Sequence, residues 1–415
     1  MNEIKTVAVI GLGYIGLPTA AILATNGINV IGVDVKPSSV EAINRGEVPF
    51  VEPDLATQVA GAVSQGMLKA TLDTPAADAY IVAVPTPFKS DKTADLSYID
   101  AAARSLAPQL IGGELVILES TSPPGATQHL ADYLVSLRPD LSLDPASRKP
   151  LIHVAHCPER VLPGRVMIEL VTNDRIVGGL TRAAAELARD LYGVFCQGDM
   201  HITDATTAEM AKLVENSYRD VNIAFANELS IISDRLGINV WELIELANHH
   251  PRVNILQPGP GVGGHCIAVD PWFIVAAAPE NSSLIRQARE TNDAKPAWVI
   301  DRVAELVQGK SSPTVAALGL AFKANIDDLR ESPAVAIVRS LSERLGDVSV
   351  LVAEPHVEEL PASLKNSSNI KLVAVEDAIA EADVVLLLVD HDVFKLLDRE
   401  LLHGKQIVDT RGIWR

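Results

Sequence analysis

The sequence is poor in aromatic residues and in charge. Aromatic side chains make up 4% of its 415 residues and charged residues 21%, whereas hydrophobic residues make up 48%. This composition argues against a disordered chain and favours helices packed on buried parallel strands, which use aliphatic residues. Because one domain usually holds about 100–200 residues, the length predicts two to four packed units.

Positive charge is also scarce. The chain has 35 lysines and arginines against 53 acidic residues, a net charge of −18. A protein that binds DNA or RNA without regard to sequence needs a basic surface, so we predict no nucleic-acid partner. Small anionic ligands are not excluded, because a few cations or a helix N-terminus can dominate the field within one pocket.

Cysteine is rare, and no targeting or membrane segment is visible. Cys157, Cys196 and Cys266 are too few and too widely spaced for a disulfide framework, which predicts a reducing, cytoplasmic location. The apolar stretch 7–24 is interrupted by three glycines and a proline, and it lacks the basic start of a signal peptide. We therefore interpret it as a buried strand followed by a helix and predict no membrane partner.

The chain divides into three blocks. Residues 1–203 alternate short β-branched runs with helical patterns, which predicts a parallel, doubly wound α/β domain. Residues 204–300 are predicted to be almost entirely helical, and residues 301–415 return to α/β as a second, smaller nucleotide-binding-like domain. The predicted strands are Thr6–Ile10, Asn29–Val33, Ala79–Val84, Leu115–Glu119, Ile152–His156, Arg175–Val177, Val315–Ala321, Val348–Ala353, Val384–Val389 and Ile407–Asp409.

The middle block opens with an unusually long helical pattern. From Asp204 to Arg235 there is no proline or glycine, and Asp204 or Thr206 can cap the start of the helix. A helix of this length is expected to run between domains and to offer a surface to a second subunit.

A glycine-rich segment follows the first predicted strand and opens a helix. Gly11, Gly13 and Gly16 form G-x-G-x-x-G. In this motif the first glycine permits a tight turn, the second lets a pyrophosphate approach the backbone, and the third lets helix and strand pack closely. Asp34 ends the next strand, where a carboxylate can accept hydrogen bonds from an adenosine ribose and would repel a 2′-phosphate. The segment predicts an NAD site; the alternative is a fold of this type that no longer binds a cofactor.

Two further turns follow predicted strands of the same sheet. The segments 84–87 (VPTP) and 119–125 (ESTSPPG) bring hydroxyl groups beyond the carboxyl ends of parallel strands, where such sheets bind ligands. Proline, serine, threonine and glycine are also ordinary turn formers. The pattern alone therefore supports ligand binding and simple turn formation equally.

Cys266 lies in a loop rich in glycine and proline, next to His265 and four residues before Asp270. Glycines let the backbone approach a ligand, and a neighbouring polar group can favour the thiolate, which is the nucleophilic form of cysteine. Cys157 and Cys196 lie in strand or helix patterns and are predicted to be inert. The nearby histidines have no ligand spacing typical of zinc, so no metal is predicted.

The long helical pattern carries polar side chains on one face. Lys212 and Asn216 are four residues apart and Arg219 follows three residues later, so the three share a face. They can donate hydrogen bonds to an oxyanion or form a solvated stripe. Glu159, just past a predicted strand, is either a base at the same edge of the sheet or a surface acid.

A nucleophilic cysteine together with a nicotinamide cofactor indicates a particular kind of oxidation. An alcohol can be taken to an acid by two hydride transfers, through a thiohemiacetal and then a thioester on the cysteine. A dehydrogenase that only interconverts an alcohol and a ketone does not need the thiol.

Several segments together resemble the UDP-glucose/GDP-mannose dehydrogenase family, whose members oxidise C6 of nucleotide-linked sugars. The resemblance covers essentially the whole chain. The matching segments are GLGYIGLP (11–18), PTP (85–87), STSPPG (120–125), PER (158–160), AEMAKLVENSYRDVNIAFANE (208–228), PGVGGHCIAVDP (260–271) and GLAFKANIDDLRESPA (319–334). It implies NAD as cofactor and two Rossmann-like domains joined by a long central helix and a helical middle domain, with the long helix also forming the core of a homodimer.

The resemblance also implies catalytic roles for five residues. Cys266 would hold the substrate carbon as a thiohemiacetal and then as a thioester. Lys212 and Asn216 would polarise the developing oxyanion. Asp270 would position the water or lysine that accepts the first proton, and Glu159 would assist hydrolysis of the thioester.

Binding roles follow from the same matches. Lys323 would meet the diphosphate of the substrate, Arg330 would reach the cofactor, and Arg252 would enter the site of a neighbouring subunit. The implied cofactor-binding residues are Gly11, Gly13, Tyr14, Ile15, Gly16, Asp34, Thr86, Thr121 and Arg330. The implied substrate-binding residues are Arg160, Lys212, Asn216, Arg219, Arg252, Gly263 and Lys323.

Within the family, segment 250–273 is most similar to the bacterial members that oxidise UDP-N-acetyl-D-mannosamine. The members that oxidise UDP-glucose typically have an aromatic residue before the paired glycines, and a Lys-Asp where this chain has Val269 and Asp270. The resemblance thus implies UDP-N-acetyl-D-mannosamine as the substrate and a uronate product used in cell-surface polysaccharides, with enterobacterial common antigen the usual setting.

Three alternatives are weighed against this prediction. The nearest is a different substrate, UDP-N-acetylglucosamine or UDP-glucose, oxidised by the same chemistry. A single-oxidation hydroxyacid dehydrogenase would share the Rossmann domain and the helical middle but would not require a thiol. A non-catalytic NAD-binding protein would leave the combination of Cys266, Lys212, Asn216 and Glu159 unexplained.

Overall fold

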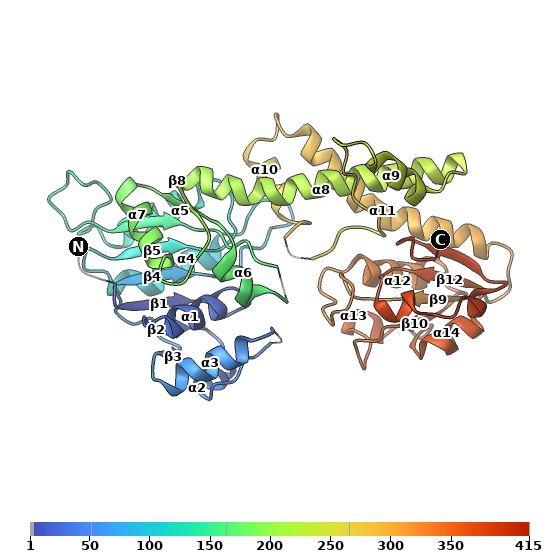
Figure 1. Cartoon of the computed structure of the whole chain (residues 1–415), viewed down its shortest axis with the longest axis horizontal. Coiled ribbons are helices and arrows are strands. Elements are labelled where there is room, and N and C mark those ends of the chain that lie inside the picture. Colours follow the sequence, from blue (N-terminus) through green and yellow to red (C-terminus); the bar gives the residue numbers. More distant parts are fainter. Residues whose placement is uncertain (1–3, 51, 163, 265, 415) are drawn as a thin grey trace. The chain divides into compact units, whose positions relative to one another are not determined.

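The computed structural model describes residues 4–50, 52–162, 164–264 and 266–414 (Figure 1). The chain forms two compact units, residues 1–215 and residues 216–415. We call them the N-terminal unit and the C-terminal unit and describe each by itself. The predicted division into three domains at residues 204 and 301 stays a prediction.

An eight-stranded sheet forms the centre of the N-terminal unit. Its strands are β1 (Thr6–Ile10), β2 (Asn29–Val33), β3 (Leu68–Thr71), β4 (Ala79–Val82), β5 (Leu115–Leu118), β6 (His153–His156), β7 (Arg175–Gly179) and β8 (Met200–Asp204), in the order β3-β2-β1-β4-β5-β6-β7-β8. Strands β1, β2, β4, β5, β6 and β7 lie where the sequence predicts them, to within two residues at either end. The edge strands β3 and β8 are additions.

One pair of strands departs from the predicted parallel arrangement. Strands β6 and β7 pair antiparallel through Ala155 with Gly179 and His156 with Gly178, whereas the other neighbours in this sheet are parallel. The connection between β6 and β7 holds only one short helix, α6 (Val166–Thr172). The chain therefore re-enters the sheet at the end where β6 leaves it.

Helices cover both faces of this sheet and bury alternate residues of each strand. Val7 and Val9 of β1 lie in one apolar cluster, and Ala8 and Ile10 lie in the other. Because successive side chains of a strand point to opposite faces, this alternation is expected of a sheet buried on both sides. The first cluster contains residues of α1 (Gly16–Thr25), α2 (Pro37–Asn44), α3 (Leu55–Ser64), α6 and α7 (Arg182–Tyr192); the second contains residues of α4 (Ser97–Leu106) and α5 (Ala126–Leu137).

The C-terminal unit contains a smaller sheet, whose strand order repeats that of the strands β3-β2-β1-β4-β5 in the first sheet. Its strands are β9 (Thr314–Leu318), β10 (Ser349–Ala353), β11 (Ile370–Leu372), β12 (Val384–Leu387) and β13 (Gln406–Asp409), in the order β11-β10-β9-β12-β13, and all are parallel. This confirms a second doubly wound α/β sheet. Edge strand β11 is again an addition, and the sheet is flanked by α12 (Pro333–Arg344), α13 (Ala362–Lys365), α14 (Val375–Glu381) and α15 (Asp392–Lys395).

Four helices make up the middle of the chain. The first, α8 (Ala205–Leu236), begins in the N-terminal unit and continues in the C-terminal unit. Asp204 caps it as predicted, accepting hydrogen bonds from the backbone N–H of Thr207 at 2.9 Å and from its hydroxyl at 2.6 Å. The others are α9 (Val240–Asn248), α10 (Asp270–Ala277) and α11 (Ser283–Val307), and the described residues between α9 and α10, 249–264 and 266–269, contain no helix or strand.

The buried side of α8 is unusually polar for a surface helix. A typical helix buries its apolar stripe and exposes its polar face. The buried positions of α8 include Asp220, Asn227 and Ser230 beside apolar residues such as Ala226, whereas Tyr218 and Phe225 are exposed. The interior of the C-terminal unit therefore meets α8 through hydrogen bonds as well as apolar contacts, and large apolar side chains are left outside.

None of the helices in the described ranges combines the length and apolar character needed to cross a bilayer.

Candidate functional site

The glycine turn between β1 and α1 has the geometry that its motif predicts. Gly11 has a φ of 95°, which favours glycine, and its N–H donates to the carbonyl of Val33 at 2.8 Å. A Cβ on Gly11 would lie 2.5 Å from the carbonyl oxygen of Ala83, and a Cβ on Gly16 would lie 1.8 Å from the carbonyl oxygen of Gly11. The first and third glycines are therefore required by the protein's own packing.

Gly13 is different, because nothing in the protein explains it. A Cβ at this position would meet no atom within 4 Å, its φ is not positive, and the residue is exposed. Open space at the second glycine is what a pyrophosphate needs in order to approach the backbone at the start of α1. The residues of the turn thus fit a dinucleotide.

Asp34 ties the turn to the end of β2. One carboxylate oxygen accepts the N–H of Leu12 at 3.0 Å and the other accepts the N–H of Lys36 at 2.9 Å. The residue is only partly buried, so its oxygens can also face a ribose. Next to the turn, Tyr14 stacks on Phe50 with ring centroids 4.3 Å apart, and Ile15, partly buried, stands at the start of α1.

The two Ser/Thr/Pro turns predicted beside this site are bound to each other. The hydroxyl of Thr86 donates to the carbonyl of Thr121 at 2.5 Å, and the hydroxyl of Ser120 donates to the carbonyl of Val84 at 2.6 Å. The two turns therefore form one hydrogen-bonded structure beyond the ends of β4 and β5. This contact accounts for the hydroxyl groups structurally, and it also brings Thr86 and Thr121 together.

Glu209 of α8 anchors the second turn, and the sequence pattern did not single it out. Its buried carboxylate accepts the N–H groups of Gly125 at 2.6 Å and Thr127 at 2.7 Å, and also the hydroxyl of Thr127. A carboxylate at the first turn of α5 satisfies N–H groups that otherwise have no partner. The only signal was a helix that begins after Pro-Pro-Gly without a capping side chain.

Glu159 lies in a buried ionic cluster. One oxygen accepts the N–H of Arg160 at 2.6 Å and the other pairs with Arg175 at 2.9 Å. Arg175 is itself buried, and its guanidinium lies 3.7 Å from the sulfur of Cys157. Burial raises the pKa of the Cys157 thiol to about 12, so this cysteine is held as an unreactive thiol, in line with its prediction.

A second buried acid, Glu119, completes this cluster. It is bonded by the hydroxyls of Thr19 at 3.2 Å and Tyr192 at 3.0 Å. Burial, together with the nearby charge of Glu159, raises the pKa of Glu119 to about 8. Glu119 stands at the end of β5 and Thr19 in α1, so the bond between them links the start of the second turn to the dinucleotide helix.

The remaining predicted residues of the N-terminal unit lie on or near α8. Arg160 pairs with Glu215 at 2.6 Å, which joins the segment after β6 to the helix. Lys212 is partly buried on α8, four residues before Asn216 and therefore on the same face.

In the C-terminal unit, Cys266, Asp270 and Asn216 come together. Cys266 is exposed, and its carbonyl accepts the N–H of Asp270 at 2.8 Å as α10 begins. The carboxylate of Asp270 is buried and accepts a hydrogen bond from the amide of Asn216 at 2.5 Å. An exposed thiol beside a carboxylate and amide pair is a suitable arrangement for covalent chemistry on a carbonyl. His265 lies outside the described residues.

The loop that leads to Cys266 packs against the segment that carries Lys323 and Arg330, the residues predicted to meet the substrate's diphosphate and the cofactor. A Cβ on Gly263 would lie 2.7 Å from the carbonyl oxygen of Glu331, and one on Gly261 would lie 3.0 Å from the side chain of Pro333. Only glycines allow this approach. The sequence-predicted Gly263 is therefore explained by its contact with segment 322–333, which bears Lys323 and Arg330.

The predicted cationic residues of the C-terminal unit lie at its surface. Lys323 is exposed and forms no ion pair among the described residues. Arg330 is exposed and pairs with Asp328 at 2.6 Å. Arg219 is exposed on α8, and Arg252 is exposed in the loop that follows α9. Across the described residues, His, Cys, Asp and Glu form no group of three suited to a metal ion.

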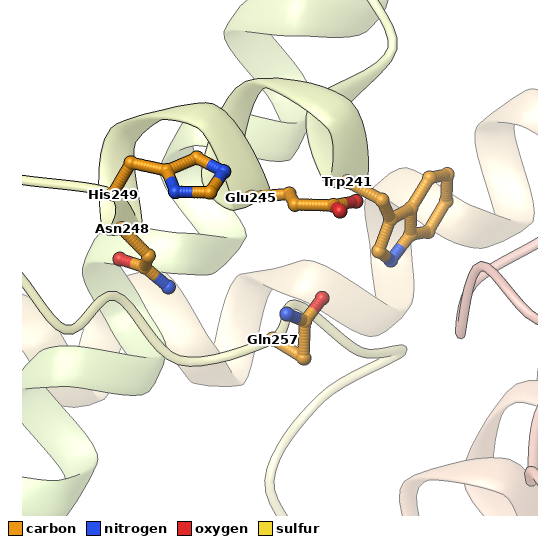
Figure 2. A pocket seen from close by; sticks show the side chains of 5 residues that line it. All are labelled: Trp241, Glu245, Asn248, His249 and Gln257. Carbon is orange, nitrogen blue, oxygen red and sulfur yellow. The ribbon is translucent and has the colours of Figure 1, made fainter.

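A separate cavity of about 390 Å³ lies beside α9 (Figure 2). Its lining residues are Trp241, Glu245, Asn248, His249 and Gln257. The amide of Asn248 is already engaged, because it bonds both the carbonyl and the N–H of Ile255. None of the residues predicted for the site lines this cavity.

Known protein families match the two segments that form the sheets and the mainly helical segment between them in the sequence. The chain matches the UDP-glucose/GDP-mannose dehydrogenase family in its NAD-binding domain over residues 5–196, its central domain over residues 206–294 and its UDP-binding domain over residues 316–415. The chain belongs to this family. It is therefore an NAD-dependent dehydrogenase, which confirms the predicted enzyme class and cofactor.

Three relatives illustrate the range of similarity. The chain is 58% identical to an NDP-N-acetyl-D-galactosaminuronic acid dehydrogenase of Ralstonia nicotianae over 99% of this chain and 97% of the relative. It is 54% identical to a UDP-N-acetyl-D-mannosamine dehydrogenase of Salmonella typhi over 99% of both. The solved structure of a UDP-D-ManNAc dehydrogenase from Pyrococcus horikoshii is 38% identical, with a TM-score of 0.87 over 99% of this chain and 96% of that one.

Proposed function

We propose that this protein oxidises the C6 hydroxyl of UDP-N-acetyl-D-mannosamine to a carboxylate in two steps. The reaction consumes two NAD⁺ and one water, and it yields the uronate, two NADH and three protons. The observation that carries the proposal is the exposed Cys266 beside the buried Asp270–Asn216 pair, in a chain that belongs to the UDP-glucose/GDP-mannose dehydrogenase family. A single oxidation would not require the thiol.

Cys266 is the centre of the covalent steps. After the first oxidation its sulfur adds to the aldehyde carbon, the new S–C bond forms, and the carbonyl oxygen takes a proton to give a thiohemiacetal. Removal of two electrons and two protons then gives a thioester, and water breaks the S–C bond to release the acid and the thiol. Bound at the turn of Gly11, Gly13 and Gly16, NAD⁺ supplies the oxidising equivalent for each step.

The other proposed catalytic groups differ in how their surroundings support them. Lys212 and Asn216 share a face of α8 and carry N–H donors suited to an oxyanion. Asp270 is buried and already bonded to Asn216, so its carboxylate is held for positioning a proton acceptor. Both oxygens of Glu159 are hydrogen-bonded and the residue is buried, so a role in thioester hydrolysis requires water to reach one of its remaining lone pairs.

The remaining proposed roles are binding roles. Lys323 meets the diphosphate as a cation without a competing ion pair among the described residues, and Arg330 reaches the cofactor. Arg160, Arg219 and Gly263 contribute to the substrate site, and Arg252 enters the site of a second subunit. The product is proposed to feed a cell-surface polysaccharide of the enterobacterial common antigen type. The cytoplasmic location stays a prediction.

The outer face of α8 supports a homodimer. Tyr218, Phe225 and Ile232 recur every seven residues and are 72%, 53% and 45% exposed. An apolar seam with this repeat is self-complementary when two helices pack side by side. Phe225→Asp is expected to shift the protein to a monomer in sedimentation velocity, whereas Leu246→Asp, at a site on α9 that is 63% exposed, should not.

UDP-N-acetyl-D-galactosamine is the second candidate substrate. The relative from Ralstonia nicotianae, whose name refers to N-acetyl-D-galactosaminuronic acid, is 58% identical to this chain, more than the 54% of the Salmonella typhi relative. The two sugars differ in configuration at C2 and C4, but both carry the same reacting C6 hydroxyl. The oxidation chemistry on Cys266 is therefore the same for either.

A substrate panel tests the proposal. UDP-N-acetyl-D-mannosamine, UDP-N-acetyl-D-galactosamine, UDP-N-acetylglucosamine and UDP-glucose are each incubated with the enzyme and NAD⁺, NADH is followed, and the product is identified by mass spectrometry. The mannosamine derivative is expected to give the highest kcat/KM and two NADH per sugar. A clear preference for another sugar would overturn the substrate. Full conversion to acid by Cys266→Ala would overturn the covalent mechanism, and one NADH per sugar with a carbonyl product would favour a single-oxidation enzyme class.

A further inference from the structure

A chain of buried polar side chains runs from α11 through α8 to the loop that carries Cys266. It consists of Arg289 and Asn292 on α11 and Asp220 and Asn227 on α8, and it ends at the backbone of Gly259. All four side chains are at most 1% exposed. Apolar residues would fill such a space at lower cost, because burying a polar group without full hydrogen bonding is unfavourable.

Asn227 is the member that touches the loop. Its amide oxygen accepts the N–H of Gly259 at 2.9 Å, and its amide nitrogen donates to the side-chain oxygen of Asn292 at 2.8 Å. Because both ends of the amide are engaged, its orientation is set and its oxygen faces the loop.

The rest of the chain holds this amide in place. Asn292 donates to the backbone oxygen of Asp220 at 3.0 Å and to its carboxylate at 2.8 Å, so the oxygen of Asn292 is left to face Asn227. The carboxylate of Asp220 also accepts a hydrogen bond from Arg289 at 2.5 Å. Burial raises the pKa of Asp220, and the charge of Arg289 opposes that rise. These hydrogen bonds fix the position of α8 relative to α11.

The loop beyond Gly259 has little freedom to adjust. Gly261 faces Pro296 and Pro333, and Gly263 faces Pro333 and the carbonyl of Glu331, with no room for a Cβ at either glycine. Gly263 is three positions before Cys266, whose carbonyl accepts the N–H of Asp270. A change of position at Gly259 is therefore expected to be passed along the loop to Cys266.

We propose that Asn227 is a positioning residue for the covalent oxidation: its bond to Gly259 sets the path of the loop and hence the place of the Cys266 thiol relative to Asp270. The proposal rests on the proposed function, since it takes Cys266 as the reacting thiol. Asp220, Arg289 and Asn292 act through Asn227. A displacement of about 1 Å at a reacting group can cost roughly a hundredfold in rate.

Three variants separate this role from a general loss of stability. Asn227→Ala removes the acceptor of the Gly259 N–H, whereas Asn227→Asp keeps an oxygen in that place. Val303→Ala is the matched control, because Val303 is buried on α11 in the apolar cluster that covers the second sheet, and no described residue of the loop 249–269 belongs to that cluster. The measurements are kcat and KM for NAD⁺, the melting temperature, and the rate at which iodoacetamide alkylates the Cys266 peptide, read by mass spectrometry.

Asn227→Ala is expected to lower kcat at least tenfold, to leave KM for NAD⁺ within about twofold, and to change the alkylation rate at least threefold. Asn227→Asp should keep most of the kcat, and Val303→Ala should lower the melting temperature with kcat unchanged. The proposal is overturned if kcat simply follows the melting temperature in all three variants, or if alkylation is the same in Asn227→Ala and the unmodified protein.

The alkylation assay needs no substrate, so failure of the proposed function is distinguishable. If the unmodified enzyme oxidises none of the UDP-sugars but Asn227→Ala still changes the alkylation rate of Cys266, the proposed function is wrong and the positioning of the loop stands. If the unmodified enzyme oxidises a UDP-sugar but Asn227→Ala leaves the alkylation rate of Cys266 unchanged, the proposed function stands and the positioning role of Asn227 is wrong.

Discussion

The two sheets begin with the same turn and use it differently. Gly11 after β1 and Gly319 after β9 have φ values of 95° and 93°. Gly11 donates to the carbonyl of Val33 at 2.8 Å, and Gly319 donates to that of Ala353 at 2.9 Å. In both units the next N–H reaches an acidic side chain just past the second strand, since Leu12 bonds Asp34 and Leu320 bonds Glu354.

The acids differ in what else they bind. Asp34 is partly exposed and accepts only two backbone N–H groups, those of Leu12 and Lys36, in the described structure. Glu354 is buried, and one of its oxygens accepts the N–H groups of Leu320 and Ala321 and the ring of His391, while the other accepts the N–H of His356. Asp34 thus keeps acceptor capacity for a ribose, and Glu354 does not.

His391 shows what the second acid does instead. Its Nδ1 accepts the N–H of Asn325 at 2.9 Å, so the ring proton is on Nε2 and faces Glu354 at 3.2 Å. Asn325 lies two residues after Lys323. The turn therefore leaves acceptor capacity for a ligand in the N-terminal unit, whereas in the C-terminal unit it helps to anchor the loop that bears Lys323. The shared topology does not by itself decide the ligand.

The largest effect on stability is expected when alanine replaces Gly11 or Gly319. The added Cβ would lie 2.5 Å from the carbonyl oxygen of Ala83 in one case and 2.4 Å from the Cβ of Val389 in the other, at a positive φ in both. Overlap and backbone strain together should lower the free energy of unfolding by about 3 kcal/mol or more. Hydrogen exchange followed by mass spectrometry should show the loss in the N-terminal unit for Gly11→Ala and in the C-terminal unit for Gly319→Ala.

Gly13→Ala is the control for this pair, because its Cβ meets nothing in the protein. Its melting temperature should stay at or slightly above that of the unmodified protein, while KM for NAD⁺ rises at least tenfold as the methyl group takes the space of the pyrophosphate. An unchanged KM would contradict the assignment of this turn to the cofactor.

The next largest difference is expected between the two acids. Although burial alone would raise the pKa of Glu354, hydrogen bonds from His391 and from the N–H of Leu320 hold it below its ordinary value. Glu354→Gln places an amide against these donors and should lower the free energy of unfolding by about 2–3 kcal/mol. Asp34→Asn should change stability by less than about 1 kcal/mol and raise KM for NAD⁺ roughly tenfold.

Urea denaturation and steady-state kinetics on both variants measure this contrast. Equal losses of stability, or a rise in KM for NAD⁺ with Glu354→Gln as large as with Asp34→Asn, would mean that the two acids are used alike.

The smallest expected effect is an opposite response of the two units to pH. Burial, aided by Glu159, raises the pKa of Glu119 to about 8 from 4.5, so the folded N-terminal unit binds this proton more tightly and loses stability as pH rises toward 8. Burial lowers the pKa of Lys295 to about 7 from 10.5, so the unfolded chain binds that proton more tightly and the C-terminal unit gains stability as pH rises above 7. Between about pH 7 and 8 the free energy of unfolding therefore falls with pH in the N-terminal unit and rises in the C-terminal unit, each by roughly 1 kcal/mol per pH unit.

Glu119→Gln and Lys295→Met should flatten the pH dependence of their own unit only. Hydrogen exchange at a series of pH values between about 6 and 9, corrected for the intrinsic exchange rate, resolves the two units. A pH dependence of stability that both variants leave unchanged would contradict its assignment to Glu119 and Lys295.

Local patterns sufficed for much of the fold. The glycine turn, β1, β2 and Asp34 were predictable because a buried strand is a continuous apolar run and because the turn needs glycine at set positions. The strands that were missed, β3, β8 and β11, all stand at sheet edges. Such strands are short and partly exposed, as in Leu68–Thr71 with its exposed Lys69, so they lack an apolar run.

The candidate site was predictable only in part. Cys266, Asp270 and Asn216 were identified from motif and spacing, and the contact between Asp270 and Asn216 joins residues 54 positions apart. Asn227 and His391 gave no signal, and Glu209 gave only the uncapped start of α5, because each acts through a backbone group far away in the sequence. From the sequence alone, a polar residue in a helix pattern is interpreted as facing solvent, because its distant partner is not known.

By itself the sequence determined the alternation of strands and helices, the dinucleotide turn and the glycine-rich loop around Cys266, because these depend on residues close together along the chain. Only the tertiary structure decided that α8 buries Asp220, Asn227 and Ser230, that Glu354 is occupied by its own loop while Asp34 keeps free capacity, and that Asn227 holds Gly259. These outcomes depend on which distant donors and acceptors meet after packing has excluded water, and local composition carries no record of that.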